Sequence, residues 1–202
     1  MRFPIERFTI LIVLLLASLV VFSGCTSTRP VPNIPEAAPP MIMVDGESLP
    51  TLSFTKLIAD VPGGRITGYH YEGLEYTRSY AHKWDENFSN QTNDLNFAAQ
   101  VVLEDAGYRV KAGGLGELLM EGTIRKMSYN SYSYKVSFDQ AECEMKWDVF
   151  RAGEDEPFFT TLTNGAGRVD SNQSGAIKAA FELALRRLLA DEAFVEAVKG
   201  QK

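Results

Sequence analysis

The stretch from Ala141 to Val149 constrains the fold of this chain more than any other part. Its apolar and charged residues alternate one by one, which makes it the strongest strand pattern in the sequence: the apolar set is Ala141, Cys143, Met145, Trp147 and Val149, and the charged set is Glu142, Glu144, Lys146 and Asp148. Successive side chains of a strand point to opposite faces. We therefore predict an antiparallel strand with one buried face and one solvated face.

Further strand patterns lie on both sides of this stretch. They are rich in β-branched and aromatic residues, and glycine and proline residues lie at their ends. They cover residues 52–59, 65–72, 118–124 and 158–163. The segment 76–92 is polar and has no regular period, so no element is predicted there.

Two segments carry apolar residues at helical spacing, 93–106 and 173–190. Asn93 is the expected N-cap of the first, and Asp191 is expected to cap a last helical segment, 191–199. Strand, helix, three strands and helix predict an α+β fold. We expect an antiparallel sheet of about four to five strands, with two main helices packed on one face.

The N-terminus has the layout of a secretory signal. Arg2 and Arg7 precede an apolar run of 13 residues, 10–22, and small residues follow it. A helix that crosses a bilayer needs roughly 18 to 20 apolar residues, so we expect a cleaved signal rather than a permanent membrane helix.

The end of this signal, Phe22, Ser23, Gly24 and Cys25, resembles the bacterial lipobox, although the family most often has Leu where this chain has Phe22. The resemblance implies cleavage between Gly24 and Cys25, a diacylglycerol group on the Cys25 thiol, and a fatty acid such as palmitate on its amine. The residue after the cysteine is Thr26 rather than Asp, which resembles the signal for export to the outer membrane. An ordinary secretory signal and an uncut signal anchor stay open as alternatives.

The chain therefore divides into three parts. Residues 1–24 are the expected lipoprotein signal peptide, 25–50 a lipidated N-terminus and proline-rich tether, and 51–202 a single α+β periplasmic domain. Six of the nine prolines lie in the tether, and proline supports neither helix nor ladder. Its apolar patch, 41–44, is expected either to dock on the domain or to begin a strand.

Charge excludes one class of partner. The chain has a net charge of −6, and no block of five or more basic residues occurs in it. Because nucleic acid binding depends on neutralising phosphates, we expect no nucleic acid partner.

The order of elements adds a looser resemblance. The lipobox, the segment LEDAGYRV, the strand LLMEGTIRKMSY and the helix AFELALRRLLADEAFVEAV together resemble small periplasmic lipoproteins of the YajG type and, more loosely, CsgG-like and ABC-transport auxiliary lipoproteins. This implies a non-enzymatic accessory role at the cell envelope. It assigns no functional residue beyond Cys25.

Catalytic and metal motifs are missing from the sequence. His70 and His82 are the only histidines, and no spacing of Cys, His and carboxylates is typical of a metal site. A hydrolase would require His70 or His82 to meet Asp85 or a serine in space, and no G-x-S-x-G motif is present. Cys143 is predicted to be a buried packing residue. We expect no cofactor and no metal.

Aromatic residues in the segments expected to be loops form the candidate interaction surface: Trp84, Tyr129, Tyr132 and Tyr134. Such side chains bury much area and keep a polar group, which suits protein interfaces. The alternative is that they pack inward and cover the edge of the sheet.

The function predicted from these features is that of a non-enzymatic accessory or binding module in envelope assembly or transport. The expected location is the periplasmic face of the outer membrane, where the lipid on Cys25 holds the chain. We also expect an envelope protein as a partner. Two alternatives stay open: a periplasmic hydrolase acting on peptidoglycan or peptide, and a structural subunit of an envelope complex.

Overall fold

The computed structural model describes residues 37–73, 77–84, 88–170 and 173–201. The predicted signal, Gly24, Cys25 and the first part of the tether lie outside these ranges, as does Asp85. Within the described ranges, no helix combines the length and the apolar character needed to cross a membrane.

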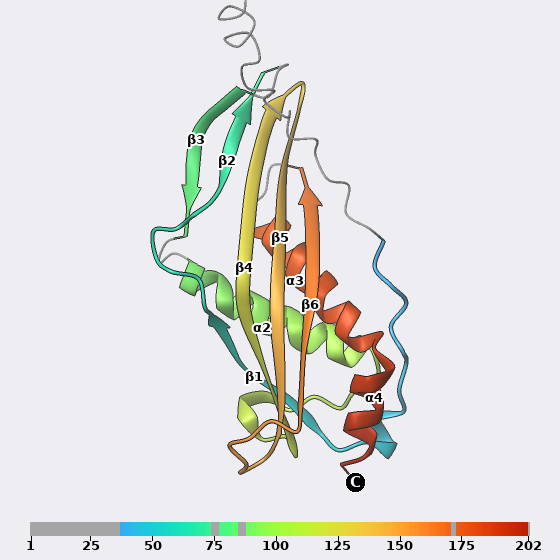
Figure 1. Ribbon diagram of the computed structural model, residues 1–202. Helices are drawn as coiled ribbons and strands as arrows, with labels where there is room; N and C mark the ends of the chain where they lie inside the picture. Colours follow the sequence, from blue (N-terminus) through green and yellow to red (C-terminus); the bar gives the residue numbers. More distant parts are fainter. Residues whose placement is uncertain (1–36, 74–76, 85–87, 171–172, 202) are drawn as a thin grey trace, which may run out of the picture. The chain divides into compact units, whose positions relative to one another are not determined.

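Six strands and three α-helices make up the described part of the chain, together with two short 3-10 helices (Figure 1). Their bounds are η1 Gly46–Ser48, β1 Leu52–Ala59, β2 Ile66–Glu72, β3 Thr77–Lys83, α2 Phe88–Asp105, η2 Ala112–Gly114, β4 Leu118–Tyr134, β5 Val136–Arg151, β6 Phe159–Val169, α3 Gln173–Leu189 and α4 Glu192–Lys199. The fold is α+β, as predicted.

The six strands form one mixed sheet, in the order β3-β2-β4-β5-β6, with β1 also paired to β4. Two strands share one side of the long strand β4: β1 runs parallel to Leu118–Ile124, and β2 runs parallel to Ser131–Ser133. Parallel pairing needs a crossover, and α2 provides it between β3 and β4. The prediction of a purely antiparallel sheet was wrong here, because alternation within a strand does not specify the direction of its neighbour.

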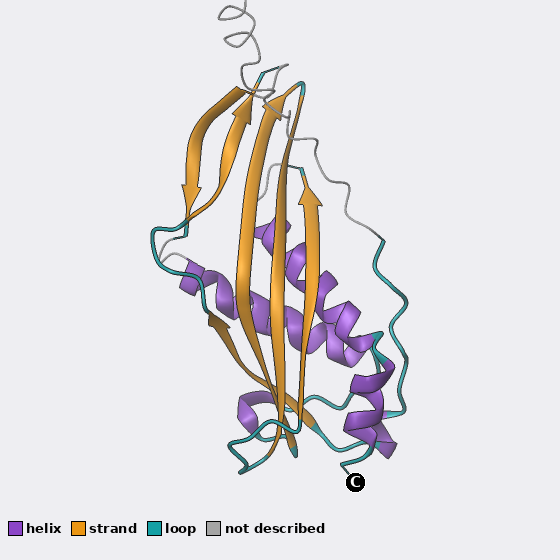
Figure 2. Cartoon of the chain, in the orientation of Figure 1, coloured by secondary structure: helices purple, strands orange, loops and turns teal. Residues whose placement is uncertain are grey.

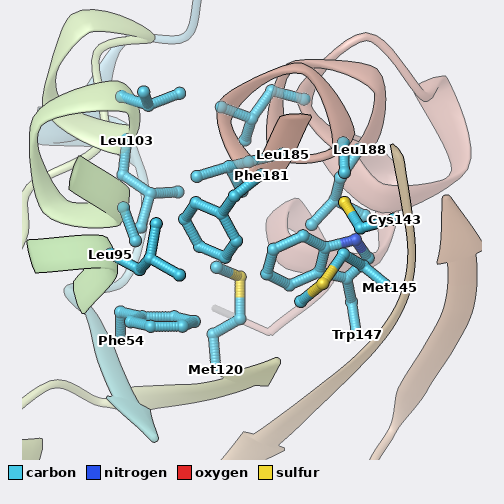
Figure 3. Packing of buried hydrophobic residues seen from close by; sticks show 14 of the residues in the cluster. Phe54, Leu95, Leu103, Met120, Cys143, Met145, Trp147, Phe181, Leu185 and Leu188 are labelled. Atoms are coloured by element: carbon cyan, nitrogen blue, oxygen red, sulfur yellow. The ribbon is translucent and has the colours of Figure 1, made fainter. Parts of the chain in front are cut away.

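Helices α2 and α3 lie side by side against one face of the sheet, which places the core between these layers (Figure 2). At its centre are three rings, Phe54 of β1, Trp147 of β5 and Phe181 of α3, with centroids 5.8 to 6.4 Å apart (Figure 3). Burying a large apolar side chain contributes about 1.5 to 3 kcal/mol to stability. This cluster therefore joins both layers of the fold.

Strand β5 has the two faces that its alternation predicts. Its apolar residues from Ala141 to Val149 are at most 4% exposed, and Lys146 and Asp148 form an ion pair of 2.8 Å between them. The indole of Trp147 donates a 2.7 Å hydrogen bond to Thr163 Oγ1 in β6, and that hydroxyl donates to the carbonyl of Ala184 in α3. The helix is thus tied to both strands.

Two glycines let α3 approach β6 closely. A Cβ atom at Gly165 would overlap the carbonyl oxygen of Ala180, and one at Gly167 would overlap that of Ala176. The backbone of α3 therefore rests directly on the strand, and side chains larger than hydrogen are excluded at both positions.

The apolar patch 41–44 docks on the domain. The backbone N–H of Ile42 donates to the carbonyl of Leu189, and that of Val44 donates to the carbonyl of Ala106, each at 3.0 Å. Met41, Ile42 and Val44 also pack against the core. Of the two expectations for this patch, docking is the one observed.

Several boundaries differ from the predictions, since β4 continues past residue 124 to Tyr134 and β6 continues past residue 163 to Val169. The segment 76–92, left unassigned, contains β3, and α2 begins at Phe88 instead of Asn93. β3 is an edge strand whose residues are mostly exposed, and two bulges interrupt its pairing with β2, so no apolar alternation marks it. The predicted cap of the last helix is confirmed, since Asp191 Oδ1 accepts the N–H of Ala193 at 2.9 Å.

Candidate functional site

Four adjacent strands bring polar side chains together on the face of the sheet that also carries the helices. His70 in β2 is directly paired with Ser131 in β4, and Ser131 is paired with Asp139 in β5. His82 comes from β3, the next strand outward. The only two histidines of the chain therefore lie in one place.

Both imidazole rings bond the same hydroxyl group. Ser131 Oγ lies 2.7 Å from His70 Nδ1 and 2.8 Å from His82 Nε2. A hydroxyl donates only one hydrogen bond, so at most one of the two ring nitrogens accepts from Ser131 and at least one donates to it. On its far side, His70 Nε2 lies 3.4 Å from Glu72 Oε1. We call His70, His82 and Ser131 the His–Ser cluster.

A glycine lets β2 approach β4 closely. A Cβ atom at Gly68 in β2 would overlap the carbonyl oxygen of Tyr129 in β4. Gly68 is also the pairing partner of His82, whose imidazole bonds Ser131 in β4.

Two tyrosines flank the histidines. The ring of Tyr80 stacks on that of His70, with centroids 4.7 Å apart, and Tyr129 meets His82 edge to face at 4.5 Å. Tyr80 is 55% exposed, but Tyr129 and Ser131 are only 4% and 7% exposed. The serine of the cluster and Tyr129 are thus buried, and the ring of Tyr80 lies between the cluster and the solvent.

Burial dominates the electrostatics of the site. It lowers the pKa of His82, and repulsion from His70 lowers it further, against the attraction of Asp139. Burial also raises the pKa of Asp139, although a hydrogen bond from Tyr129 and the two histidines oppose this rise. Both groups are therefore shifted toward their neutral forms.

The opposite face of the same strands carries an aromatic row. Tyr71, Tyr132 and Phe138 stack in sequence, at centroid distances of 5.1 and 4.4 Å. Arg168 lies over Phe138, with its guanidinium carbon 3.8 Å from the ring centroid. All three rings are at most 7% exposed, so the end of the sheet beyond the helices has its own small core.

Three of the four residues of the predicted interaction surface are buried. Tyr129 and Tyr132 lie on β4 rather than in a loop and are each 4% exposed, and Trp84, directly after β3, is 9% exposed. Tyr134 ends β4, and its side chain lies outside the described residues. The alternative that these rings pack inward is the one observed, because the strands extend past the helices and are covered with aromatic side chains on both faces.

The remaining candidates are placed as follows. Cys143 is buried, as predicted, and burial raises the pKa of its thiol to about 12. No group of three or more His, Cys, Asp and Glu side chains within the described ranges is arranged to hold a metal ion. Ser131 and Asp139 were missed, because strand register brings them to the histidines and no spacing in the sequence marks them.

Comparisons with known proteins add similarities of low score. No protein-family model and no curated protein matches this chain. Among solved structures, it is similar to a Xanthomonas campestris protein of the DUF330 family, with 15% identity over 82% of this chain and 96% of that chain and a TM-score of 0.36. A minor lipoprotein from Acinetobacter baumannii has 8% identity, 67% and 90% coverage and a TM-score of 0.33. The PelC dodecamer from Paraburkholderia phytofirmans has 11% identity, 78% and 97% coverage and a TM-score of 0.36. Scores and identities this low carry no argument about the function of this chain.

Proposed function

We propose that this chain is a lipid-anchored protein of the bacterial envelope that acts as a non-enzymatic accessory or binding module in envelope assembly or transport. The observation that carries the proposal is the series Phe22, Ser23, Gly24 and Cys25 directly after a basic and apolar signal. The thiol is the nucleophile that accepts the diacylglycerol group. Several acyl chains hold a protein on a membrane effectively permanently, since each buried methylene contributes about 0.8 kcal/mol.

Thr26 after the anchoring cysteine supports the periplasmic face of the outer membrane as the location. The prolines that follow support an extended tether. At about 3.1 Å per residue, a polyproline segment from Cys25 to the docked residue Met41 reaches roughly 50 Å. The domain is then a module held near the membrane and free to meet partners at some distance from it.

A labelling experiment tests the anchor. In cells supplied with labelled palmitate, the wild-type chain should incorporate the label, and Cys25→Ala should lose it together with its membrane fraction. Cys143→Ala is the matched control, because this thiol is buried in the core and should leave labelling unchanged. Label that persists in Cys25→Ala would overturn the proposal.

Partner capture tests the accessory role. Mild crosslinking of the lipidated protein in membranes, followed by affinity purification and mass spectrometry, should recover an envelope protein. A partner recovered at a fixed ratio would favour the alternative of a structural subunit. Recovery of no envelope partner would contradict an accessory role.

A hydrolase is the second candidate, and one observation favours it. Glu72, His70 and Ser131 are connected in the order carboxylate, imidazole and hydroxyl, which is the connectivity of an activated serine nucleophile. In this function His70 Nδ1 would take the proton of Ser131. Against it stands the 7% exposure of Ser131 in the middle of a strand.

A fluorophosphonate probe distinguishes the two functions. A hydrolase should be labelled on Ser131, lose the label in Ser131→Ala, and keep it in Ser133→Ala, the control two residues further along β4. An unlabelled wild-type protein would contradict the hydrolase and agree with the binding module.

A further inference from the structure

The hairpin of β2 and β3 is joined to the rest of the sheet by a short ladder. β2 pairs with β4 at only three positions, from His70 with Ser131 to Glu72 with Ser133. The pairing of β2 with β3 has two register shifts as well. In Figure 1 the hairpin lies beyond the part of the sheet that α2 and α3 cover. Side-chain contacts must therefore supply much of what holds the hairpin in place.

The His–Ser cluster is such a contact. Both histidines belong to the hairpin, and the serine belongs to β4. The two hydrogen bonds, 2.7 and 2.8 Å long, thus cross from one unit to the other on one face of the sheet. On the opposite face, the stack of Tyr71 on Tyr132 crosses the same boundary.

Protonation changes the chemistry of this contact. Neutral histidines can offer Ser131 one donor and one acceptor, whereas two imidazolium rings offer only donors, so the oxygen must accept from both. Their two nitrogen atoms then point at the single oxygen of Ser131, which is 7% exposed, and the two positive charges are held close together. Repulsion and lost hydration both oppose the doubly charged state.

The groups that face the two rings do not cancel this cost. They are Glu72 from β2, Tyr80 from β3, Tyr129 from β4 and Asp139 from β5. The carboxyl of Glu72 is 59% exposed, so solvent screens it, and the buried carboxyl of Asp139 can offset one charge at most.

We propose that His70, His82 and Ser131 form a proton-controlled contact that fixes the β2–β3 hairpin to β4 when the histidines are neutral and releases the hairpin when both are protonated. Because histidine is the side chain that titrates near neutral pH, the hairpin responds to mild acid while the helix-covered core does not.

Amide hydrogen exchange of the full-length lipidated protein in detergent tests this inference. Exchange is compared at about pH 7.5 and about pH 5.5 after correction for the intrinsic rates, and we expect opening of residues 66–72 and 77–83 to increase at least about tenfold in acid. Peptides from the centre of β5 should show no such increase. Equal hairpin opening at the two pH values would overturn the proposal.

Substitutions identify the groups responsible. His70→Gln and His82→Gln each remove one of the two rings that share Ser131, so the pH dependence of hairpin opening should be lost or reduced to a small fraction. Lys83→Gln is the matched control, since it removes a charge from the same hairpin and should keep the full response. Ser131→Ala removes the shared hydroxyl, so the hairpin should open more than in the wild type at about pH 7.5 and the ratio of opening between the two pH values should fall. A full pH response in either histidine variant, or in Ser131→Ala, would assign the effect to other groups and overturn the proposal.

Discussion

The hydroxyl of Tyr108 shows how one polar atom limits the stability of the core. The residue is 3% exposed, its ring lies 6.0 Å from that of Phe194, and its oxygen has no hydrogen-bond partner within the described part of the chain. Burial accordingly raises the pKa of the phenol. A buried polar group without a partner costs about 1 to 3 kcal/mol.

Replacing Tyr108 with Phe should therefore stabilise the protein. We expect the free energy of unfolding to rise by about 1 kcal/mol, because the ring is kept and the unpaired hydroxyl is removed. Urea unfolding followed by circular dichroism measures the change. Tyr129→Phe is the matched control with the opposite sign, since its hydroxyl bonds Asp139 and Ser131. A destabilised Tyr108→Phe would show that this hydroxyl does have a partner.

The raised pKa of Asp139 makes the free energy of unfolding depend on pH in a defined direction. Burial raises its pKa above the ordinary value of 3.8, so the folded chain holds this proton to higher pH than the unfolded chain does. The resulting stability is fully present below pH 3.8 and is lost as the pH rises through the folded pKa. Asp139→Asn stays neutral and should escape this loss, so the variant should gain stability relative to the wild type as the pH rises.

Urea unfolding at a series of pH values checks this prediction. Asp60→Asn is the control, because the carboxyl of Asp60 is 65% exposed and pairs with Arg125 at the surface. If the difference between Asp139→Asn and the wild type is constant with pH, the raised pKa is not a property of the folded state.

At the scale of elements, the close contact of α3 with β6 is sensitive to any added side-chain volume. Gly165→Ala places a methyl group where the carbonyl of Ala180 lies, so the helix must move away from the strand. Overpacking typically costs 1 to 3 kcal/mol, and we expect about 3 kcal/mol here because a backbone atom is in the way. Thermal unfolding measures it. Gly63→Ala, where nothing lies within 4 Å, should be nearly neutral, and equal effects at both sites would refute the packing argument.

The elements differ in how far the sequence predicts them. β1 and the apolar face of β5 were predicted with the right residues, as was the helix beginning at Gln173, because apolar and β-branched residues mark β1, strict alternation marks β5 and helical spacing of apolar residues marks α3. β3 was missed, since an exposed edge strand has no buried face to mark it. The parallel pairing of β1 with β4 was also missed, because it follows from the path of α2 and not from the strand itself.

The His–Ser cluster could be predicted only in part. His70 and His82 stood out as the only histidines, and a meeting with a serine was one of the stated conditions for a hydrolase. Which serine they meet depends on the register of β2 against β4 and on the close approach of these two strands at Gly68. Neither property follows from the period of a single strand.

At the scale of the whole molecule, the docked segment joins the tether to the domain. Ile42 is half-buried against the core, whereas its neighbour Met43 is 66% exposed. Ile42→Ala should lower the free energy of unfolding by about 1 to 2 kcal/mol, less than a fully buried site would lose. Met43→Ala should change it little, and equal losses in the two variants would show that docking does not contribute to stability. Urea unfolding of both variants provides the comparison.

The same docking determines where a mechanical load enters the domain. A pull on the chain before Met41 acts first on the bonds from Ile42 to Leu189 and from Val44 to Ala106, at the ends of α3 and α2. These two hydrogen bonds and their apolar contacts must break before the force reaches η1 and then β1. Tension applied through the preceding residues is thus received by the helical layer, and the β2–β3 hairpin bears load only after the docked residues have been pulled away.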